Sequence, residues 1–211
     1  MSASAKAPPY DGGMKTVFFD IDTQLDFLYP AGALYVPGAE AIVPDVALLN
    51  AYASEHGISV VSTIDAHAED DPEFHHWPPH CIAGTAGQQK PAATLLEPRI
   101  SIRSTRENFD LKDVRQILLE KQSVDCFTNA NLPALLDALG AETCVVYGVV
   151  TEICVKNAAL GLLKAGLNVT LLTDVVRSLN DTKCTEFFQQ FGTAGGKLLT
   201  VSQLVPKSNT L

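Results

Sequence analysis

The chain has few of the features that mark secreted, membrane-bound or nucleic-acid-binding proteins. No run of apolar residues reaches the about 18 that a membrane span requires, and the stretch MSASAKAPPYDGG has no apolar segment of the kind that directs secretion. We expect residues 1–13 to be a disordered leader. Basic residues are scarce: 15 Lys and Arg against 24 Asp and Glu give a net charge of −9, which repels phosphate backbones and anionic lipid surfaces. We therefore expect neither nucleic acid nor membrane partners.

Two familiar motifs are also missing. The cysteines are odd in number and form no CxxC pair, so neither a disulfide framework nor a zinc ribbon is indicated; they are Cys81, Cys126, Cys144, Cys154 and Cys184. This favours a reducing, cytoplasmic setting. The first apolar run leads into DIDTQLDF instead of G-x-G-x-x-G, which disfavours a dinucleotide-binding oxidoreductase.

What the sequence does contain is a regular alternation of strand-length apolar runs and longer helical segments. The runs lie at residues 16–19, 58–63, 100–102, 117–120, 143–148 and 168–173, with a weaker one near residue 200. Such alternation is typical of βαβ units. With 211 residues and 46% hydrophobic content, the chain can form one sizeable core. We predict a single domain over residues 14–211, an α/β fold built as a three-layer α/β/α sandwich around a mostly parallel, roughly six-stranded sheet.

Helix boundaries are indicated by caps. We predict a helix over 39–57 that stops at Gly57, one from an Asn131 N-cap to Gly140, one over 151–166, and one over 178–192 that closes at Gly192. The stretch from 66 to 97 has no regular period and is rich in Pro, His and acidic residues. A long irregular segment in a compact domain is usually functional.

Reactive side chains follow the predicted strands, so an open parallel sheet would gather them in one crevice. Cys154 lies at the start of a predicted helix, where backbone N–H groups and the macrodipole stabilise a thiolate; the alternative is an ordinary buried cysteine, to which we assign Cys126 and Cys144. Asp22 follows the first strand, between Asp20 and Asp26, and three neighbouring acids would raise one another's pKa.

Asp22 would then suit a general base. At least one of the three acids should only cap a turn. Lys121 ends another strand, where it could hold Asp22 ionised or lower the pKa of the thiol.

A metal site is indicated in the same crevice. Asp65 and His67 point to the same side of an extended chain, and His80 can return across the loop to join them, with Glu73 as an additional candidate. A carboxylate with two imidazoles leaves coordination positions open, as in catalytic sites, and accepts zinc, iron or manganese.

These motifs resemble those of the isochorismatase-like cysteine hydrolases, and among them the nicotinamidases. The resemblance runs from about residue 14 to 205 and rests on six ordered blocks: DTQLDF, AGALYVPGAE, IDAH, WPPHCIAGTAG, the lysine of EKQSVDCF, and GVVTEICV. The WPPHC block is the part specific to nicotinamidases.

The resemblance implies a catalytic triad of Asp22, Lys121 and Cys154 and one divalent metal, zinc first, on Asp65, His67 and His80, with Glu73 at the place of an optional fourth ligand. It also implies a cis peptide between Val149 and Val150, and an oxyanion hole from the amides of Val150 and Cys154.

The activity implied is hydrolysis of nicotinamide to nicotinate and ammonia through a thioester, with a role in NAD salvage and assembly as a dimer or tetramer. Phe27 and Trp77 are candidates to stack on the substrate ring; ordinary core packing is the alternative. Ala66 and Ala68 stand where relatives usually carry an aromatic residue and a proline, so another amide of the ureido, maleamate or biuret type stays open. Family members that cleave isochorismate lack the cysteine, which argues for C–N cleavage. A non-catalytic scaffold would not need the intact triad.

Overall fold

A seven-stranded parallel sheet forms the centre of the molecule. The computed structural model describes residues 15–205; the predicted leader over 1–13 lies outside the described residues. The strands are β1 (Thr16–Ile21), β2 (Ser59–Asp65), β3 (Arg99–Ile102), β4 (Gln116–Lys121), β5 (Thr143–Val149), β6 (Asn168–Arg177) and β7 (Lys197–Leu199). They lie in the order β3-β4-β2-β1-β5-β6-β7, and every neighbouring pair is parallel.

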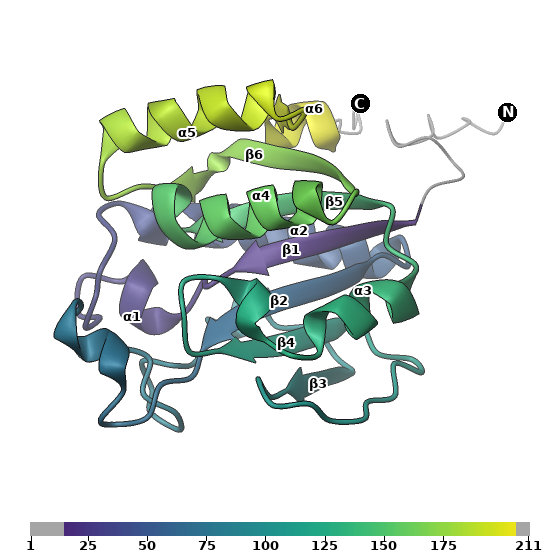
Figure 1. Cartoon of the computed structure of the whole chain (residues 1–211). Helices are drawn as coiled ribbons and strands as arrows, with labels where there is room; N and C mark the ends of the chain where they lie inside the picture. The colour runs from purple at the N-terminus through teal and green to yellow at the C-terminus, as the bar shows by residue number, and fades with distance from the viewer. Residues whose placement is uncertain (1–14, 206–211) are drawn as a thin grey trace, which may run out of the picture.

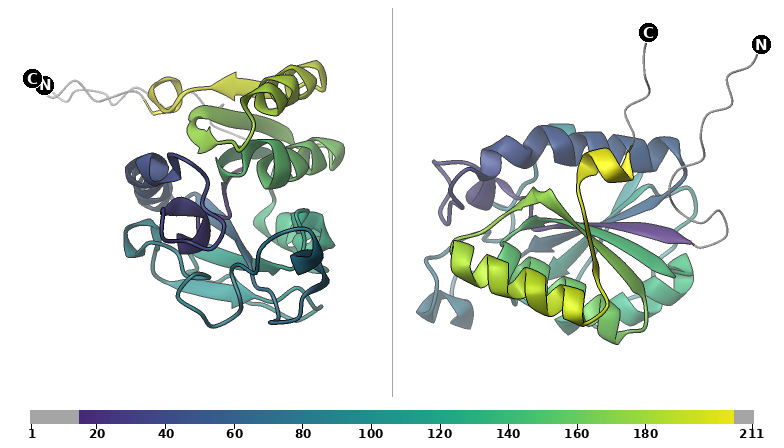
Figure 2. Two further views of the ribbon diagram at one scale, coloured as in Figure 1. Left: turned by 90° about the vertical axis from the view of Figure 1, so that its left-hand side faces the viewer. Right: turned by 90° about the horizontal axis from the view of Figure 1, so that it is seen from above.

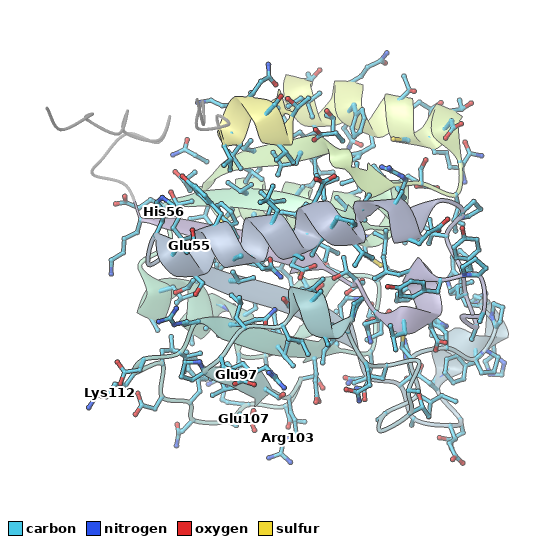
Figure 3. All side chains as sticks on the ribbon, turned by 180° about the vertical axis from the view of Figure 1, so that it is seen from behind. Glu55, His56, Glu97, Arg103, Glu107 and Lys112 are labelled. Carbon is cyan, nitrogen blue, oxygen red and sulfur yellow. The ribbon has the colours of Figure 1, made fainter. Side chains whose placement is uncertain are left out.

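Helices cover both faces of this sheet, as Figures 1 and 2 show. Figure 1 has α3 (Leu132–Leu139), α4 (Lys156–Lys164) and α5 (Asp181–Thr193) in front of the strands. On the other face, α2 (Val43–Glu55) lies across the sheet and ends at Glu55, with His56 following it, as seen from behind in Figure 3; the short α6 (Val201–Leu204) packs on the same side. Each face has its own apolar core, because the central strands are buried on both sides and read as continuous apolar runs.

The predicted three-layer α/β/α fold is therefore confirmed, with seven strands in place of about six, because the weaker run near residue 200 pairs with β6 as an edge strand. No helix within residues 15–205 is long and apolar enough to cross a bilayer. The irregular stretch after β2 contains only two short 3-10 helices, Pro72–His75 and Ala92–Thr94. That a single domain extends over 14–211 stays a prediction.

Four predicted helix ends need correction. Asn131 precedes α3 but does not cap it: its side chain accepts from the Glu107 backbone N–H and donates to the carbonyls of Arg103 and Thr105, which ties down the loop after β3. The last large helix continues past Gly192 to Thr193.

The segment 151–166 begins as a π-helical turn, Thr151–Val155, before α4, and 39–57 begins as a 3-10 turn, Ala39–Ile42. Local hydrogen-bond register, which residue type does not reveal, decides these ends.

Gly148 allows β1 and β5 to approach each other at the end that carries the reactive groups. Its φ is +120°, and a Cβ there would overlap the carbonyl oxygen of Ile21. We expect Gly148→Ala to lower the free energy of unfolding by about 3 kcal/mol or more, from strain and overlap together. The matched control is Gly57→Ala, where φ is +68° but the space is open, with an expected loss of about 1 kcal/mol. Urea unfolding of both variants tests this, and equal losses would contradict it.

Candidate active site and metal centre

Four strands that lie next to one another, β4, β2, β1 and β5, each deliver one reactive side chain to the same edge of the sheet. Lys121 is the last residue of β4 and Asp65 the last of β2, and the two are register partners. Asp22 follows β1, and Cys154 follows β5 within the π-helical turn. The predicted convergence is thus what the strand order produces, since parallel strands end at a common edge.

Asp22 is held rigidly at this edge. It adopts a left-handed backbone conformation (φ 49°) and is 1% exposed. Thr63 on β2 makes three hydrogen bonds with it: the hydroxyl donates to Oδ1 at 2.7 Å, and the backbone N–H of Asp22 donates to the Thr63 carbonyl at 3.1 Å and to the hydroxyl oxygen at 3.2 Å. The other carboxylate oxygen lies 2.8 Å from the Lys121 ammonium. The role of Thr63 could not be predicted from the sequence, because only the register of β1 and β2 places it beside Asp22.

Lys121 lies between two carboxylates and the thiol. Its ammonium, 1% exposed, makes ion pairs with Asp22 and Asp65 and lies 3.9 Å from the sulfur of Cys154. Burial lowers the pKa of this amine, but the two carboxylates outweigh burial and hold it well above its ordinary value. Lys121 therefore stays charged. Burial raises the pKa of the Asp65 carboxyl, but the Lys121 ammonium, together with His67 and His80, outweighs burial and lowers it.

The Cys154 thiol is 8% exposed and lines a cleft at the sheet edge. Burial raises its pKa well above the ordinary value; Lys121 lowers it, and the carboxylates of Asp22 and Asp65 raise it again. The expectation of a thiolate stabilised by a helix terminus is therefore wrong for this environment. Desolvation of the buried thiol is the largest cause of the raised pKa.

Proton transfer from Cys154 to Asp22 avoids the cost of a second buried negative charge. Burial also raises the pKa of Asp22, with Lys121 opposing it. Because the proton stays within the cluster, its total charge does not change when the thiolate forms and the carboxyl becomes neutral. The geometry thus favours activation by a neighbouring base over a permanently ionised sulfur.

Asp20 and Asp26 do not share the role of Asp22. Asp20 is fully buried in an ion pair with Lys90 at 2.9 Å and also accepts from Thr23. Asp26 accepts the backbone N–H groups of Ala33 and Cys81, at 3.0 and 2.7 Å, and so joins two loops. The predicted mutual effect of three acids is wrong, because the acid that raises the pKa of Asp22 is Asp65. The prediction that one acid only caps a turn does not describe Asp26, which links two separate loops.

Asp65, His67 and His80 form the only group of three potential metal donors within residues 15–205 whose ligand atoms lie within 4.8 Å of one another. One oxygen of Asp65 lies 3.8 Å from Nε2 of each histidine. Gln24 fixes the backbone of Asp65 by accepting its N–H at 2.7 Å and donating to its carbonyl at 2.9 Å. This glutamine of the DTQLDF block was not singled out in the sequence.

The donor set fits a divalent cation. Neither ring nitrogen of the fully buried His67 has a hydrogen-bond partner, although Nδ1 lies 3.0 Å from an oxygen of Asp71. For Nε2 this is costly unless something else satisfies its lone pair. Burial lowers the pKa of His67, but Asp65 and Asp71 outweigh it and raise it, so the surroundings favour positive charge. Nitrogen and oxygen donors in this combination suit zinc and related metals. Glu73 lies outside the set of three but lines the adjoining cleft, so its role as a fourth ligand stays a prediction.

The cleft itself has apolar walls. Phe27 and Trp77, the two predicted substrate contacts, both line it, together with Leu34, Val124, Ile153 and Leu179, which the sequence did not reveal. Its polar lining comes from Cys154, Asp65, Glu73 and His80, with Val150 beside the cysteine. The peptide between Val149 and Val150 is cis. The described residues that line the cleft include no lysine or arginine.

Glu152 connects this cleft to a distant loop. The side chain is buried, and one carboxylate oxygen accepts the backbone N–H groups of Leu179 and Asn180 at 3.1 and 2.8 Å. Leu179 is thereby held over the cleft, although it is 41% exposed. The contact with Glu152 therefore explains how Leu179, which belongs to no recognisable motif, comes to line the cleft.

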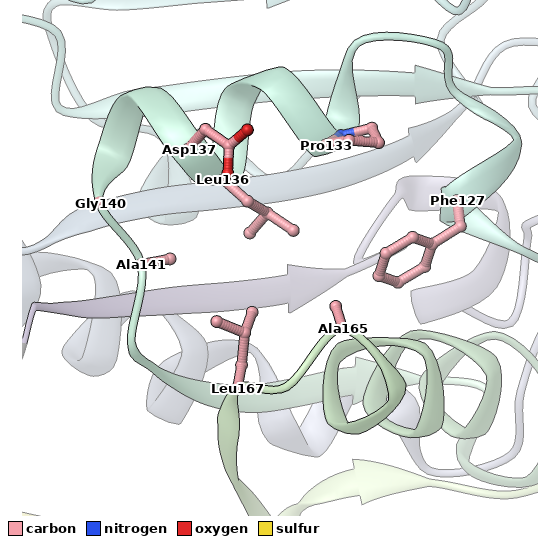
Figure 4. A pocket seen from close by; sticks show the side chains of 8 residues that line it. All are labelled: Phe127, Pro133, Leu136, Asp137, Gly140, Ala141, Ala165 and Leu167. Carbon is pink, nitrogen blue, oxygen red and sulfur yellow. The ribbon is translucent and has the colours of Figure 1, made fainter.

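A second hollow lies between α3 and α4, away from these groups (Figure 4). Its lining includes Phe127, Leu136 and Leu167, and Asp137 is its only titratable side chain. It offers no nucleophile or metal donor set, so the cleft beside Cys154 is the candidate active site.

Residues 16–203 match the family model of the Isochorismatase domain. The chain belongs to the isochorismatase family. It is 26% identical over 182 residues to a nicotinamidase of Acinetobacter baylyi, and the match covers 76% of this chain and 80% of that protein. It is 25% identical over 166 residues to a maleamate amidohydrolase of Pseudomonas putida, and this match covers 78% of this chain and 73% of that protein. The structure is similar to that of a Pyrococcus horikoshii pyrazinamidase in complex with zinc, with a TM-score of 0.76 and 26% identity over 88% of this chain and 99% of that one. The predicted family is confirmed.

Proposed function

We propose that this hydrolase converts nicotinamide and water to nicotinate and ammonia, with Cys154 as nucleophile. The observation that carries the proposal is the placement of the triad at the end of an apolar cleft that adjoins a metal donor set. The amide-hydrolase class agrees with the relatives described above.

The first half of the reaction forms a thioester. Asp22 takes the thiol proton, the sulfur attacks the amide carbon, and the backbone N–H groups of Val150 and Cys154 hold the developing oxyanion. Lys121 stays charged throughout, because Asp65 and the thiolate remain beside it when Asp22 takes up the proton. Asp22 then protonates the departing ammonia, and in the second half it guides the water that releases the acid.

Asp65, His67 and His80 would hold the metal, which supplies Lewis acidity toward the pyridine nitrogen or toward a water. The ion could be zinc, iron or manganese, with zinc favoured by the likeness to the pyrazinamidase complex. A role in NAD salvage, a cytoplasmic setting and a dimer or tetramer stay predictions.

The charge of the cleft favours a neutral aromatic amide over an anionic one. Maleamate carries a carboxylate, which a site normally binds through arginine or lysine. The cleft wall has Glu73 and Asp65 and no lysine or arginine, whereas Phe27 and Trp77 can contact a ring. The likeness to a maleamate amidohydrolase keeps that amide as the second candidate.

The test is ammonia release from nicotinamide, maleamate and a ureido amide by zinc-loaded protein. We expect nicotinamide to exceed maleamate in kcat/KM by about 100-fold, because about 3 kcal/mol of charge is left uncompensated. The ureido amide, which has no ring for Phe27 and Trp77 to contact, should also be hydrolysed more slowly than nicotinamide. Faster hydrolysis of maleamate than of nicotinamide would overturn the proposed substrate and leave the proposed amidase mechanism intact. If none of the three amides released ammonia, both the proposed substrate and the proposed mechanism would be overturned.

Trp77 provides a direct reading of binding, because it is the only tryptophan of the chain. Half-buried at the cleft, it should change its fluorescence when nicotinamide or nicotinate stacks beside it. Titration of a Cys154→Ala variant, which binds without turnover, measures this change, and Trp77→Phe is the blank. A fluorescence that saturating nicotinamide leaves unaltered would exclude contact between Trp77 and the ring.

A further inference from the structure

We propose that Asp71 is a positioning residue that orients His67 through its second ring nitrogen and thereby raises the affinity of the metal site. The inference rests on the metal site of the proposed function, but not on the identity of the substrate.

The contact itself is short and buried. Oδ2 of Asp71 lies 3.0 Å from Nδ1 of His67, a side chain with no exposed surface, and the Asp71 side chain is only 10% exposed. A neutral imidazole carries one N–H. The 3.0 Å contact is an ion-pair distance and not an aligned hydrogen bond, because neither ring nitrogen of His67 has a hydrogen-bond partner. A metal bound to Nε2, which lies 3.8 Å from Asp65, would leave the ring proton on Nδ1, where it faces the Asp71 carboxylate. A carboxylate in this outer position fixes the tautomer and makes the ligating nitrogen more basic.

Asp71 is itself fixed by the turn that it begins. Its other oxygen accepts the backbone N–H of Glu73 at 2.9 Å and caps the 3-10 helix Pro72–His75. Its own backbone N–H donates to the Ala68 carbonyl at 3.2 Å. One carboxylate thus joins a metal ligand to the turn that carries Glu73, so neither can move independently of the other.

The second imidazole is oriented differently. Nδ1 of His80 lies 2.8 Å from the carbonyl oxygen of Pro78, a neutral acceptor. The charged acceptor is therefore specific to His67. Of the acidic run at 69–71, Glu69 and Asp70 are exposed, and only Asp71 turns inward. The run that looked like a solvated loop in the sequence contains one buried partner of the metal site.

The test compares Asp71→Asn with Asp70→Asn, which removes the same charge from the next residue. Zinc dissociation constants are measured by competition with a chromophoric chelator, without substrate. We expect Asp71→Asn to weaken zinc binding by about 10–100-fold and Asp70→Asn to change it by less than about twofold. Asparagine keeps an oxygen for the cap, so the metal-free variants should unfold alike in urea.

Equal effects of the two substitutions would overturn the proposal in favour of a general charge effect of the loop. A second measurement is independent of affinity: in zinc-loaded wild type, NMR should show a His67 Nδ1 proton protected from exchange, and this protection should be lost in Asp71→Asn. An unprotected proton in the wild type would also overturn the proposal. If zinc affinity and proton protection behave as expected but nicotinamide is not hydrolysed, only the proposed substrate is contradicted, and the role of Asp71 stands.

Discussion

Replacing Cys154 with alanine should lower ammonia release by about 10⁴-fold or more, while the protein keeps its fold and binds its substrate. The sulfur is the only thiol or hydroxyl nucleophile among the side chains that line the cleft, and Asp22 and Lys121 are arranged around it. Without it, neither half of the reaction can pass through a covalent intermediate. Steady-state ammonia release and the fluorescence titration of Trp77 together separate the loss of chemistry from a loss of binding.

Cys184→Ala is the matched control for this prediction. That thiol is half-exposed on α5 and lines no part of the cleft, so its removal should leave kcat within about twofold of wild type. Acid quenching during turnover, followed by mass spectrometry, should find the acyl group on the peptide that contains Cys154. Substantial activity in Cys154→Ala would sink the nucleophilic mechanism and leave a metal-activated water as the remaining route.

Much of the site could be predicted from the sequence because its members end strands. Asp65 and Lys121 are strand-terminal residues, and parallel register alone brings them together. The residues that were missed contact the site by other means. Thr63 reaches Asp22 from within β2, and Glu152 holds Leu179 across 27 residues of chain. Such contacts depend on register and loop path, which leave no periodic pattern.

The electrostatic character of the site was harder to predict than its membership. The spacing of Cys154 suggested an acidic thiol, whereas its pKa depends on how completely the cluster is buried and how many carboxylates share it. The same limit applies to the acids around Asp22: sequence proximity suggested that Asp20 acts on it, but Lys90 neutralises Asp20 in a separate buried pair. Which charges interact is decided by packing, not by spacing.

Lys121→Met should destabilise the metal-free protein by about 3–5 kcal/mol and also abolish activity. The substitution keeps most of the volume but leaves Asp22 and Asp65 buried without their common cation. Because Lys121 is the largest cause that lowers the pKa of Asp22, its loss should raise that pKa further and oppose the ionised base that the mechanism needs. Urea unfolding near neutral pH measures the first effect, and ammonia release the second.

A second substitution separates the two effects. Asp22→Asn on the Lys121→Met background removes one of the unpaired carboxylates, so the double variant should regain about 1–2 kcal/mol relative to Lys121→Met while activity stays absent. Asp22→Asn alone completes the cycle, and it should be inactive with its fold intact. The outcome that would contradict this prediction is a free energy of unfolding of Lys121→Met equal to that of the wild type, with no gain in the double variant. The ammonium would then not be needed to keep the two carboxylates buried. Recovery of stability in the double variant would instead show that the buried cation stabilises the strand ends by compensating the charge of Asp22.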